Sequence, residues 1–302
     1  MSERASSSPP PQTQYDYTPP VSRLLRLGDV RGQIAWTNYR ALGLTAEQVP
    51  GLIRMAVDEE LQWADSDSPE VWAPLHAWRA LAQLQAGPAA EPLVGLLDRI
   101  DEFNDEWVNE ELPVVFSQIG EAALEPLARC LADPGRGLWA RVAAAKSLVA
   151  LGRYRPELRD GCVAVLAGQL AAFENQSPTL NGFIVSYLVD LGAVEVEAVM
   201  ARAFGAGRVD LGVLGDWEET QIQLGLLAER LTPKPRSALL NRVLGLLGEA
   251  APPAPEPAKR PAEAGNKPKV VSQAKLETQR KAKAKAKRKQ QRQTRKKSRK
   301  RT

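Results

Sequence analysis

Apolar residues recur at three- and four-residue intervals through most of this chain, the spacing expected of helices that bury one face. Leu81 and Leu84 show this spacing, as do Ile184, Leu188 and Leu191. Alternation with a period of two, which marks strands, is nearly absent. The pattern predicts four helical hairpins, in each of which one apolar run ends at a glycine and a second run follows. The hairpins cover residues 78–97 about Gly87, 114–131 about Gly120, 143–166 about Gly152 and 183–204 about Gly192.

The first two hairpins share their turn sequence as well as their pattern. The letters read G-P-A-A-E-P-L from Gly87 and, one residue longer, G-E-A-A-L-E-P-L from Gly120. This similarity indicates internal duplication. A single hairpin cannot bury its apolar face, whereas stacked hairpins form a continuous core, so the sequence predicts an all-α protein built as an α-solenoid.

The period of 32 to 40 residues between the glycines, with Pro-Leu a few residues later, resembles HEAT repeats over roughly residues 75–230. It is most similar to the bacterial HEAT-like group that includes phycobilisome lyase-like proteins. Segments near Tyr17, Trp36 and Gly215 are also similar to an uncharacterised bacterial family of such proteins. The resemblance implies a HEAT-like solenoid that serves as a scaffold. In some relatives it also implies attachment or removal of bilin chromophores.

Composition divides the chain into five predicted segments. Residues 1–20 are rich in Ser and Pro and are predicted to be a disordered leader, and residues 21–74 a helical N-terminal cap. Residues 75–249 form the predicted repeat solenoid, which ends in a helical pair at 221–231 and 237–247. Residues 250–261 hold five prolines and are predicted to be a stiff linker, and residues 262–302 a disordered basic tail.

Charge is distributed very unevenly along the chain. Residues 259–302 contain 19 of the 40 Lys and Arg and only two acids, a formal charge of +17, whereas residues 1–258 carry −13. Residues 1–258 use 19 Arg and two Lys, while the tail uses 12 Lys and seven Arg. Arg suits paired contacts on a folded surface, and Lys supplies a hydrated point charge. The tail residues predicted to bind nucleic acid are Arg280, Lys281, Lys283, Lys285, Lys287, Arg288, Lys289, Arg292, Arg295, Lys296, Lys297, Arg299, Lys300 and Arg301.

No aromatic residue follows Trp217, so the tail cannot stack on bases. We therefore expect it to contact the phosphate backbone of RNA or DNA without sequence specificity. An anionic membrane, an acidic protein, or no specific partner are the alternatives.

Residues 98–111 carry seven carboxylates and one arginine. A Ca²⁺ loop is not predicted, because the stretch lacks the glycine turn and the ligand spacing of such a loop. It is either a solvated helix face or an acidic docking patch for a basic partner or for the chain's own tail, with Trp107 as an exposed anchor. The predicted patch consists of Asp98, Asp101, Glu102, Asp105, Glu106, Trp107, Glu110 and Glu111.

Signals for catalysis are weak. His76, the single histidine, has no nucleophile motif near it, and Cys130 and Cys162 lie among apolar residues at equivalent hairpin positions, as expected of buried thiols. We find no phosphate-binding glycine loop and no metal-ligand spacing, so no catalytic residue, metal or cofactor is predicted. An apolar run of 18 residues and a secretory leader are also missing, and we expect a cytoplasmic protein.

The sequence thus favours a non-enzymatic HEAT-like scaffold that binds a protein partner and is held on nucleic acid by its tail. One alternative is a phycobilin lyase-like factor for chromophore attachment. The other is an adaptor whose tail masks its own acidic body and has no role with nucleic acid. The oligomeric state and the partner are left open.

Overall fold

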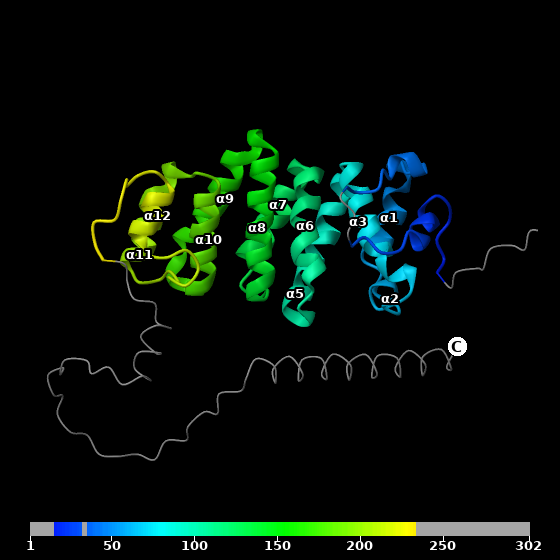
Figure 1. Cartoon of the computed structure of the whole chain (residues 1–302), viewed down its shortest axis with the longest axis horizontal. Coiled ribbons are helices and arrows are strands. Elements are labelled where there is room, and N and C mark those ends of the chain that lie inside the picture. Colours follow the sequence, from blue (N-terminus) through cyan, green and yellow to red (C-terminus); the bar gives the residue numbers. More distant parts are fainter. Residues whose placement is uncertain (1–14, 32–34, 234–302) are drawn as a thin grey trace, which may run out of the picture. The chain divides into compact units, whose positions relative to one another are not determined.

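The structure is a computed structural model that describes residues 15–31 and 35–233. The chain divides into two units, Met1–Thr232 and Pro233–Thr302, and every described residue except Pro233 belongs to the first. The described residues contain helices and no strands, so the all-α prediction is confirmed for them (Figure 1). The predicted helix at 237–247, the proline-rich linker at 250–261 and the basic tail at 262–302 lie outside the described residues.

Twelve α-helices and ten short 3₁₀ helices make up the described part of the chain. The α-helices are α1 Val49–Ala56, α2 Glu59–Gln62, α3 Ala73–Gln83, α4 Ala90–Val94, α5 Asp98–Phe103, α6 Glu106–Ile119, α7 Leu124–Ala132, α8 Leu138–Tyr154, α9 Arg159–Ala171, α10 Pro178–Asp190, α11 Glu197–Gly205 and α12 Trp217–Gln223. The 3₁₀ helices are η1 Val21–Arg26, η2 Arg40–Leu42, η3 Ala46–Gln48, η4 Pro69–Trp72, η5 Gly87–Ala89, η6 Gly95–Leu97, η7 Glu121–Ala123, η8 Pro156–Leu158, η9 Phe173–Asn175 and η10 Val194–Val196.

The four predicted hairpins are present as α3–α4, α6–α7, α8–α9 and α10–α11. In each hairpin a short 3₁₀ helix (η5, η7, η8 or η10) makes the turn into the second α-helix. The duplicated sequences that begin at Gly87 and Gly120 therefore fold alike. Each of these 3₁₀ helices leads directly into the second α-helix of its hairpin.

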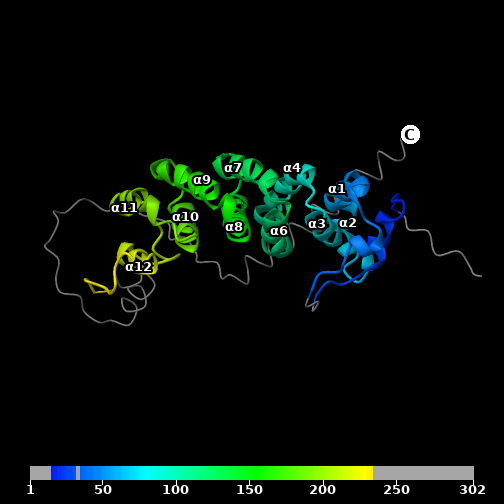
Figure 2. The same ribbon diagram turned by 90° about the horizontal axis from the view of Figure 1, so that it is seen from above.

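Successive hairpins pack side by side in two rows. Helices α3, α6, α8 and α10 each pack against the next, while α4, α7, α9 and α11 do the same in the second row (Figure 2). One contiguous cluster of buried apolar residues runs from Val21 to Val209. Each hairpin therefore completes the core of its neighbours, as the stacking argument predicts.

The predicted role of the glycines is correct at two hairpins and wrong at two. Gly120 and Gly192 have positive φ values of 89° and 61° and end their helices. Gly87 begins η5 instead, and the left-handed residue of that turn is Gln85, with φ 51°. Gly152 lies inside α8, where a Cβ would approach Leu191 to 3.2 Å. Close packing, not a turn, explains that glycine.

The N-terminal segment packs against the first hairpin through α1 and α3, and its contacts include residues before the predicted cap at 21–74. The phenol of Tyr17 donates a hydrogen bond to Asp58 at 2.7 Å, and the guanidinium of Arg54 lies 4.3 Å from its ring centre. The prediction of a disordered leader is therefore wrong for residues 15–20. Residues 1–14 lie outside the described residues.

His76 joins this segment to α3 and is fully buried. Its Nε2 donates to the carbonyl oxygen of Gly28 at 2.9 Å, and its Nδ1 accepts from the hydroxyl of Tyr39 at 2.7 Å. In the neutral ring, Nε2 is the donor and Nδ1 the acceptor of this pair of bonds. Burial, with Arg79 nearby, lowers the pKa of His76 below its ordinary value of 6.5. The histidine has a structural role, as the sequence indicated.

We expect the free energy of unfolding to decrease as the pH is lowered from about 7.5 to about 5.5, in part because His76 becomes protonated. As the pH falls, His76 becomes protonated near pH 6.5 in the unfolded chain but only at a lower pH in the folded chain. The stability that neutral His76 contributes is therefore complete above about pH 6.5 and is lost below it. Urea titrations of the wild type and of His76→Gln, which keeps one donor and one acceptor, measure it. The variant should lose less stability over this range, and equal losses would show that His76 does not contribute.

The C-terminal end of the described unit differs from the prediction. The expected helix at 221–231 instead begins at Trp217 and ends at Gln223, and Gly225 follows with φ 74°. Asp216 caps α12 by accepting from the amide of Glu219 at 3.0 Å. Arg230 folds back onto Asp216 at 2.6 Å and holds the pKa of that carboxyl at about 2.

Candidate docking site at the α5–α8 junction

The acidic stretch at residues 98–111 is not one helix. Helix α5 ends at Phe103, because Asn104 takes the left-handed conformation with φ 55°. Asp105 then caps α6, accepting from the amide of Val108 at 3.2 Å. The carboxylates therefore point from two helices and a connecting turn, and the prediction of a single solvated helix face is wrong.

Three acids of the predicted patch form ion pairs within the protein. Asp98 pairs with Arg136 of the α7–α8 loop at 3.3 Å, and Asp105 with Arg99 at 2.9 Å. Glu111 points inward and pairs with Arg79 of α3 at 2.5 Å, with side chains that are 14% and 6% exposed. These three carboxylates stabilise the packing of helices, which sequence spacing alone did not reveal.

Asp101 has a different task, since it caps a helix that begins 37 residues later. Its carboxylate accepts from the amides of Trp139 at 3.1 Å and Ala140 at 2.8 Å, the first turn of α8. The N-cap residue of α8 is Gly137, which has no side chain that could accept these hydrogen bonds. A Cβ on Gly137 would overlap the carboxylate of Asp101. The backbone of Gly137 has φ −60°, so glycine is needed there for space and not for conformation.

Gly137→Ala is expected to lower the free energy of unfolding by about 1–2 kcal/mol, because the new methyl group displaces the cap from α8. Asp101→Ala should cost a similar amount, and the double variant little more than either, since both changes remove one interaction. Urea denaturation of the full chain measures all three. Gly168→Ala is the control: a Cβ there meets nothing within 4 Å, and alanine favours its helix. Additive losses would contradict the shared cap.

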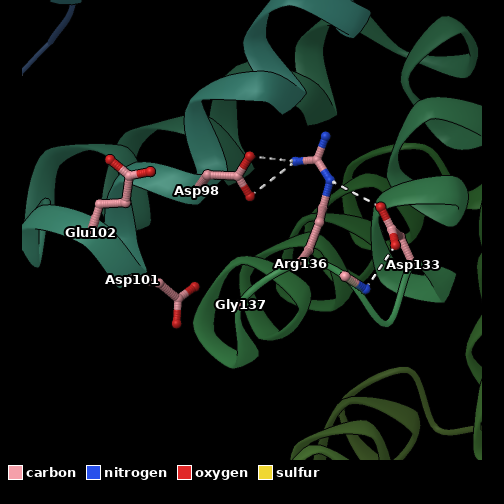
Figure 3. Close-up of a pocket in the computed structure, with 7 residues that line it drawn as sticks. Asp98, Asp101, Glu102, Asp133, Arg136 and Gly137 are labelled. Carbon is pink, nitrogen blue, oxygen red and sulfur yellow. Dashed lines mark hydrogen bonds and ion pairs between the residues drawn. The ribbon is translucent and has the colours of Figure 1, made fainter.

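A pocket of about 500 Å³ lies between α5 and the loop that precedes α8 (Figure 3). Asp98 and Asp133 both face Arg136, while Asp101 and Glu102 lie on the side of α5. Four carboxylates against one guanidinium give the pocket a formal charge of −3. Within the described ranges, no group of three or more His, Cys, Asp or Glu is arranged to hold a metal ion. The pocket therefore offers negative charge to a solvent-exposed ligand.

The other members of the predicted patch are dispersed. Glu102, Glu106 and Glu110 are exposed. Trp107 is half-buried and packs edge-on against Trp72, with ring centres 5.4 Å apart, so it is not the exposed anchor that we predicted.

The exposed tryptophan of this region is Trp139, at 46% exposure in the first turn of α8. Its ring meets Phe183 of α10 edge-on at 5.8 Å, and Phe183 lies 6.0 Å from Tyr187. Sequence reasoning missed it, although a signal was present. Lys146 and Arg153 follow Trp139 at intervals of seven residues, so all three lie on one face of α8. Charged residues on a helix face indicate that this face is toward solvent.

Both cysteines are buried, as predicted, Cys130 in α7 and Cys162 in α9. Burial raises the pKa of each thiol to about 11. A thiol in such a setting is protonated at neutral pH and is a poor nucleophile.

Several arginines of the body donate to carbonyls at or near the ends of helices, a contact that favours Arg over Lys. Each reaches a helix other than its own, and the guanidinium suits this because it offers several donors in one plane. The pairs are Arg40 with Gln83, Arg136 with Val94, Arg155 with Gln118, Arg141 with Leu131, Arg208 with Phe173 and Arg159 with Leu191. These guanidinium groups are thereby engaged inside the fold.

The tail residues that were predicted to bind nucleic acid, at 280–301, lie outside the described residues, so their contacts stay a prediction. None of the helices in the described part of the chain is long and apolar enough to cross a bilayer. Comparison with family models, with curated proteins and with solved structures gave no match.

Proposed function

We propose that the protein is a non-enzymatic scaffold, an α-solenoid of HEAT-like hairpins that binds a protein partner on its helical body. The basic tail holds it on RNA or DNA without sequence specificity. Paired rows of hairpins support the solenoid, because such arrays present long continuous faces to partners.

The separation of charge carries this proposal. Residues 15–233 contain 17 Lys and Arg against 31 Asp and Glu, and many of those arginines are engaged with helix ends or carboxylates. The body therefore repels phosphate and has few cations to offer it. Residues 259–302 hold 19 cations against two acids, so phosphate contacts fall to the tail.

The test compares the binding of fluorescent RNA and duplex DNA, over a series of salt concentrations, by two full-length chains. One is the wild type and the other has glutamine in place of the fourteen tail cations at 280–301. Binding that is tight, sensitive to salt and lost in the variant supports the tether. Equal affinity of both chains would contradict it, and binding by neither would favour the adaptor with a self-masking tail.

Chromophore attachment, the enzymatic alternative, gains no support from the described residues. Covalent attachment of a bilin to this chain would need an accessible thiolate, whereas the thiols of Cys130 and Cys162 are buried and their pKa values are raised to about 11. These thiols therefore do not support a bilin held on this chain. Attachment to a cysteine of another protein does not depend on them, and no described residue favours that reaction as a second function.

A further inference from the structure

We infer that the face of α8 and α10 around Trp139 is a docking surface for a lysine- and arginine-rich segment of a partner protein. This inference rests on the proposed scaffold function and names the partner's chemistry. Three features carry it: an aromatic strip that the described residues leave partly exposed, an acidic pocket at the N-terminal end of the same helix, and the charge of the described body.

The aromatic strip consists of Trp139, Phe183 and Tyr187. Trp139 is 46% exposed, while the two α10 rings are half-buried beside it, at centre distances of 5.8 Å and 6.0 Å along the strip. Helices α8 and α10 pack directly against each other, so the strip crosses their junction. An exposed tryptophan on rigid helices offers a large contact area with little loss of side-chain entropy.

The acidic pocket lies at the N-terminal end of α8, the helix that carries Trp139. The backbone amide of Trp139 donates to Asp101 at 3.1 Å, and Asp101 lines the pocket together with Asp98, Glu102 and Asp133 (Figure 3). Arg136 is the one cation in its lining, so a formal charge of −3 lies at the N-terminal end of α8, the helix whose first turn carries Trp139. A lysine or arginine side chain suits both features, because its alkyl stem packs on aromatic rings while its charged head meets carboxylates.

Charge also disfavours two other ligands for this surface, nucleic acid and a second copy of the body. A phosphate backbone would meet carboxylates at the pocket and a body with 14 more acids than bases over residues 15–233. The same excess of acids disfavours a second copy of this body, since two faces of like charge repel each other. The chain's own tail has suitable chemistry, but in the proposed function nucleic acid neutralises it, which leaves the surface to a separate basic partner.

The experiment measures binding of a fluorescein-labelled peptide of twelve residues, alternating alanine with lysine or arginine, to the full-length chain at about 0.15 M salt. A peptide with glutamate in place of the cations is the negative control. We expect Trp139→Ala to weaken binding about tenfold and Trp139→Phe to restore most of it, because the interaction needs an aromatic face. Thermal unfolding of each variant shows whether the fold is intact.

Matched variants elsewhere on the surface separate this site from general attraction to an acidic protein. Tyr154→Ala removes another exposed ring, at the far end of α8, and should leave binding unchanged. Glu102→Gln should weaken binding several-fold, whereas Glu157→Gln, an exposed acid in η8, should not.

Equal affinity of Trp139→Ala and wild type would overturn the inference. Peptide binding that appears only when the tail cations at 280–301 are replaced by glutamine would assign the surface to the chain's own tail, and would overturn its assignment to a separate partner. The RNA measurement is independent of both results. If the chain binds RNA but not the peptide, the docking surface is contradicted and the tether is not. If it binds the peptide but not RNA, the tether is contradicted and the docking surface is not.

Discussion

Replacing the fourteen tail cations by glutamine is expected to lower the affinity for duplex DNA and RNA by at least about 10³-fold at 50 mM salt. If seven of them neutralise phosphates, the logarithm of the wild-type affinity falls with the logarithm of salt at a slope of about −6 on duplex DNA. A fourfold rise in salt then costs about 10³–10⁴-fold in affinity. The glutamine variant, which keeps five of the 19 tail cations, should show a much shallower slope. Fluorescence anisotropy over 50 to 200 mM salt measures both quantities.

Two half-variants sharpen this prediction, because residues 280–289 and 292–301 hold seven cations each. An electrostatic tether without sequence specificity predicts that neutralising either half lowers the slope by a similar amount. Arg153→Gln with Arg202→Gln, which removes two exposed cations of the body, should change little. A large effect of one half and none of the other would indicate a localised recognition site in place of a tether.

Glu111→Ala is expected to lower the free energy of unfolding by about 3–5 kcal/mol, the largest effect of any single substitution proposed here. Glu111 and Arg79 make two hydrogen bonds, at 2.5 Å and 3.1 Å, between α6 and α3. Trp36 covers the guanidinium, with 5.2 Å from its ring centre to the Arg79 Cζ. Removing the carboxylate leaves a buried positive charge without its partner, and such a charge is costly to keep from water.

The double variant Arg79→Leu with Glu111→Leu separates two effects: the loss of the ion pair itself, and the cost of leaving the Arg79 charge buried without Glu111. Because both charges are then absent, it should be markedly more stable than Glu111→Ala. Glu110→Ala, on the exposed side of the same helix, should change stability by about 0.5 kcal/mol or less. Urea denaturation of the full chain measures each variant. Similar losses for Glu110→Ala and Glu111→Ala would show that the buried pair has no special role.

The hairpins were predictable from sequence because local signals agree with packing. The spacing of apolar residues, the repeated turn sequences at Gly87 and Gly120, and the capping aspartate at Asp216 each depend on a few neighbouring residues. The end of α12 was not predictable in the same way. Arg230 draws the chain back onto Asp216, a contact that propensity does not encode.

The candidate site shows the limit of sequence reasoning more clearly. Seven acids within 14 residues suggested one uniform face, yet Asp101 caps α8 and Glu111 is held inside the fold. Those roles depend on residues about 30 to 40 positions away, such as Arg79 and Gly137, and only the fold brings them near. Trp139 was hidden for the opposite reason, because a tryptophan is expected in the core until its position on the helix is known.

Arginines that donate to carbonyls at helix ends link each hairpin to its neighbours. Arg155, which follows α8, donates to Gln118 at the end of α6, and Arg159 of α9 donates to Leu191 after α10. The α8–α9 hairpin therefore supplies donors to the hairpins on both of its sides. Melting the α8–α9 hairpin would leave a carbonyl without its donor on each of the two neighbours, so unfolding of the array should be cooperative. Amide hydrogen exchange would then report one opening event across α6 to α10 in place of fraying from the ends.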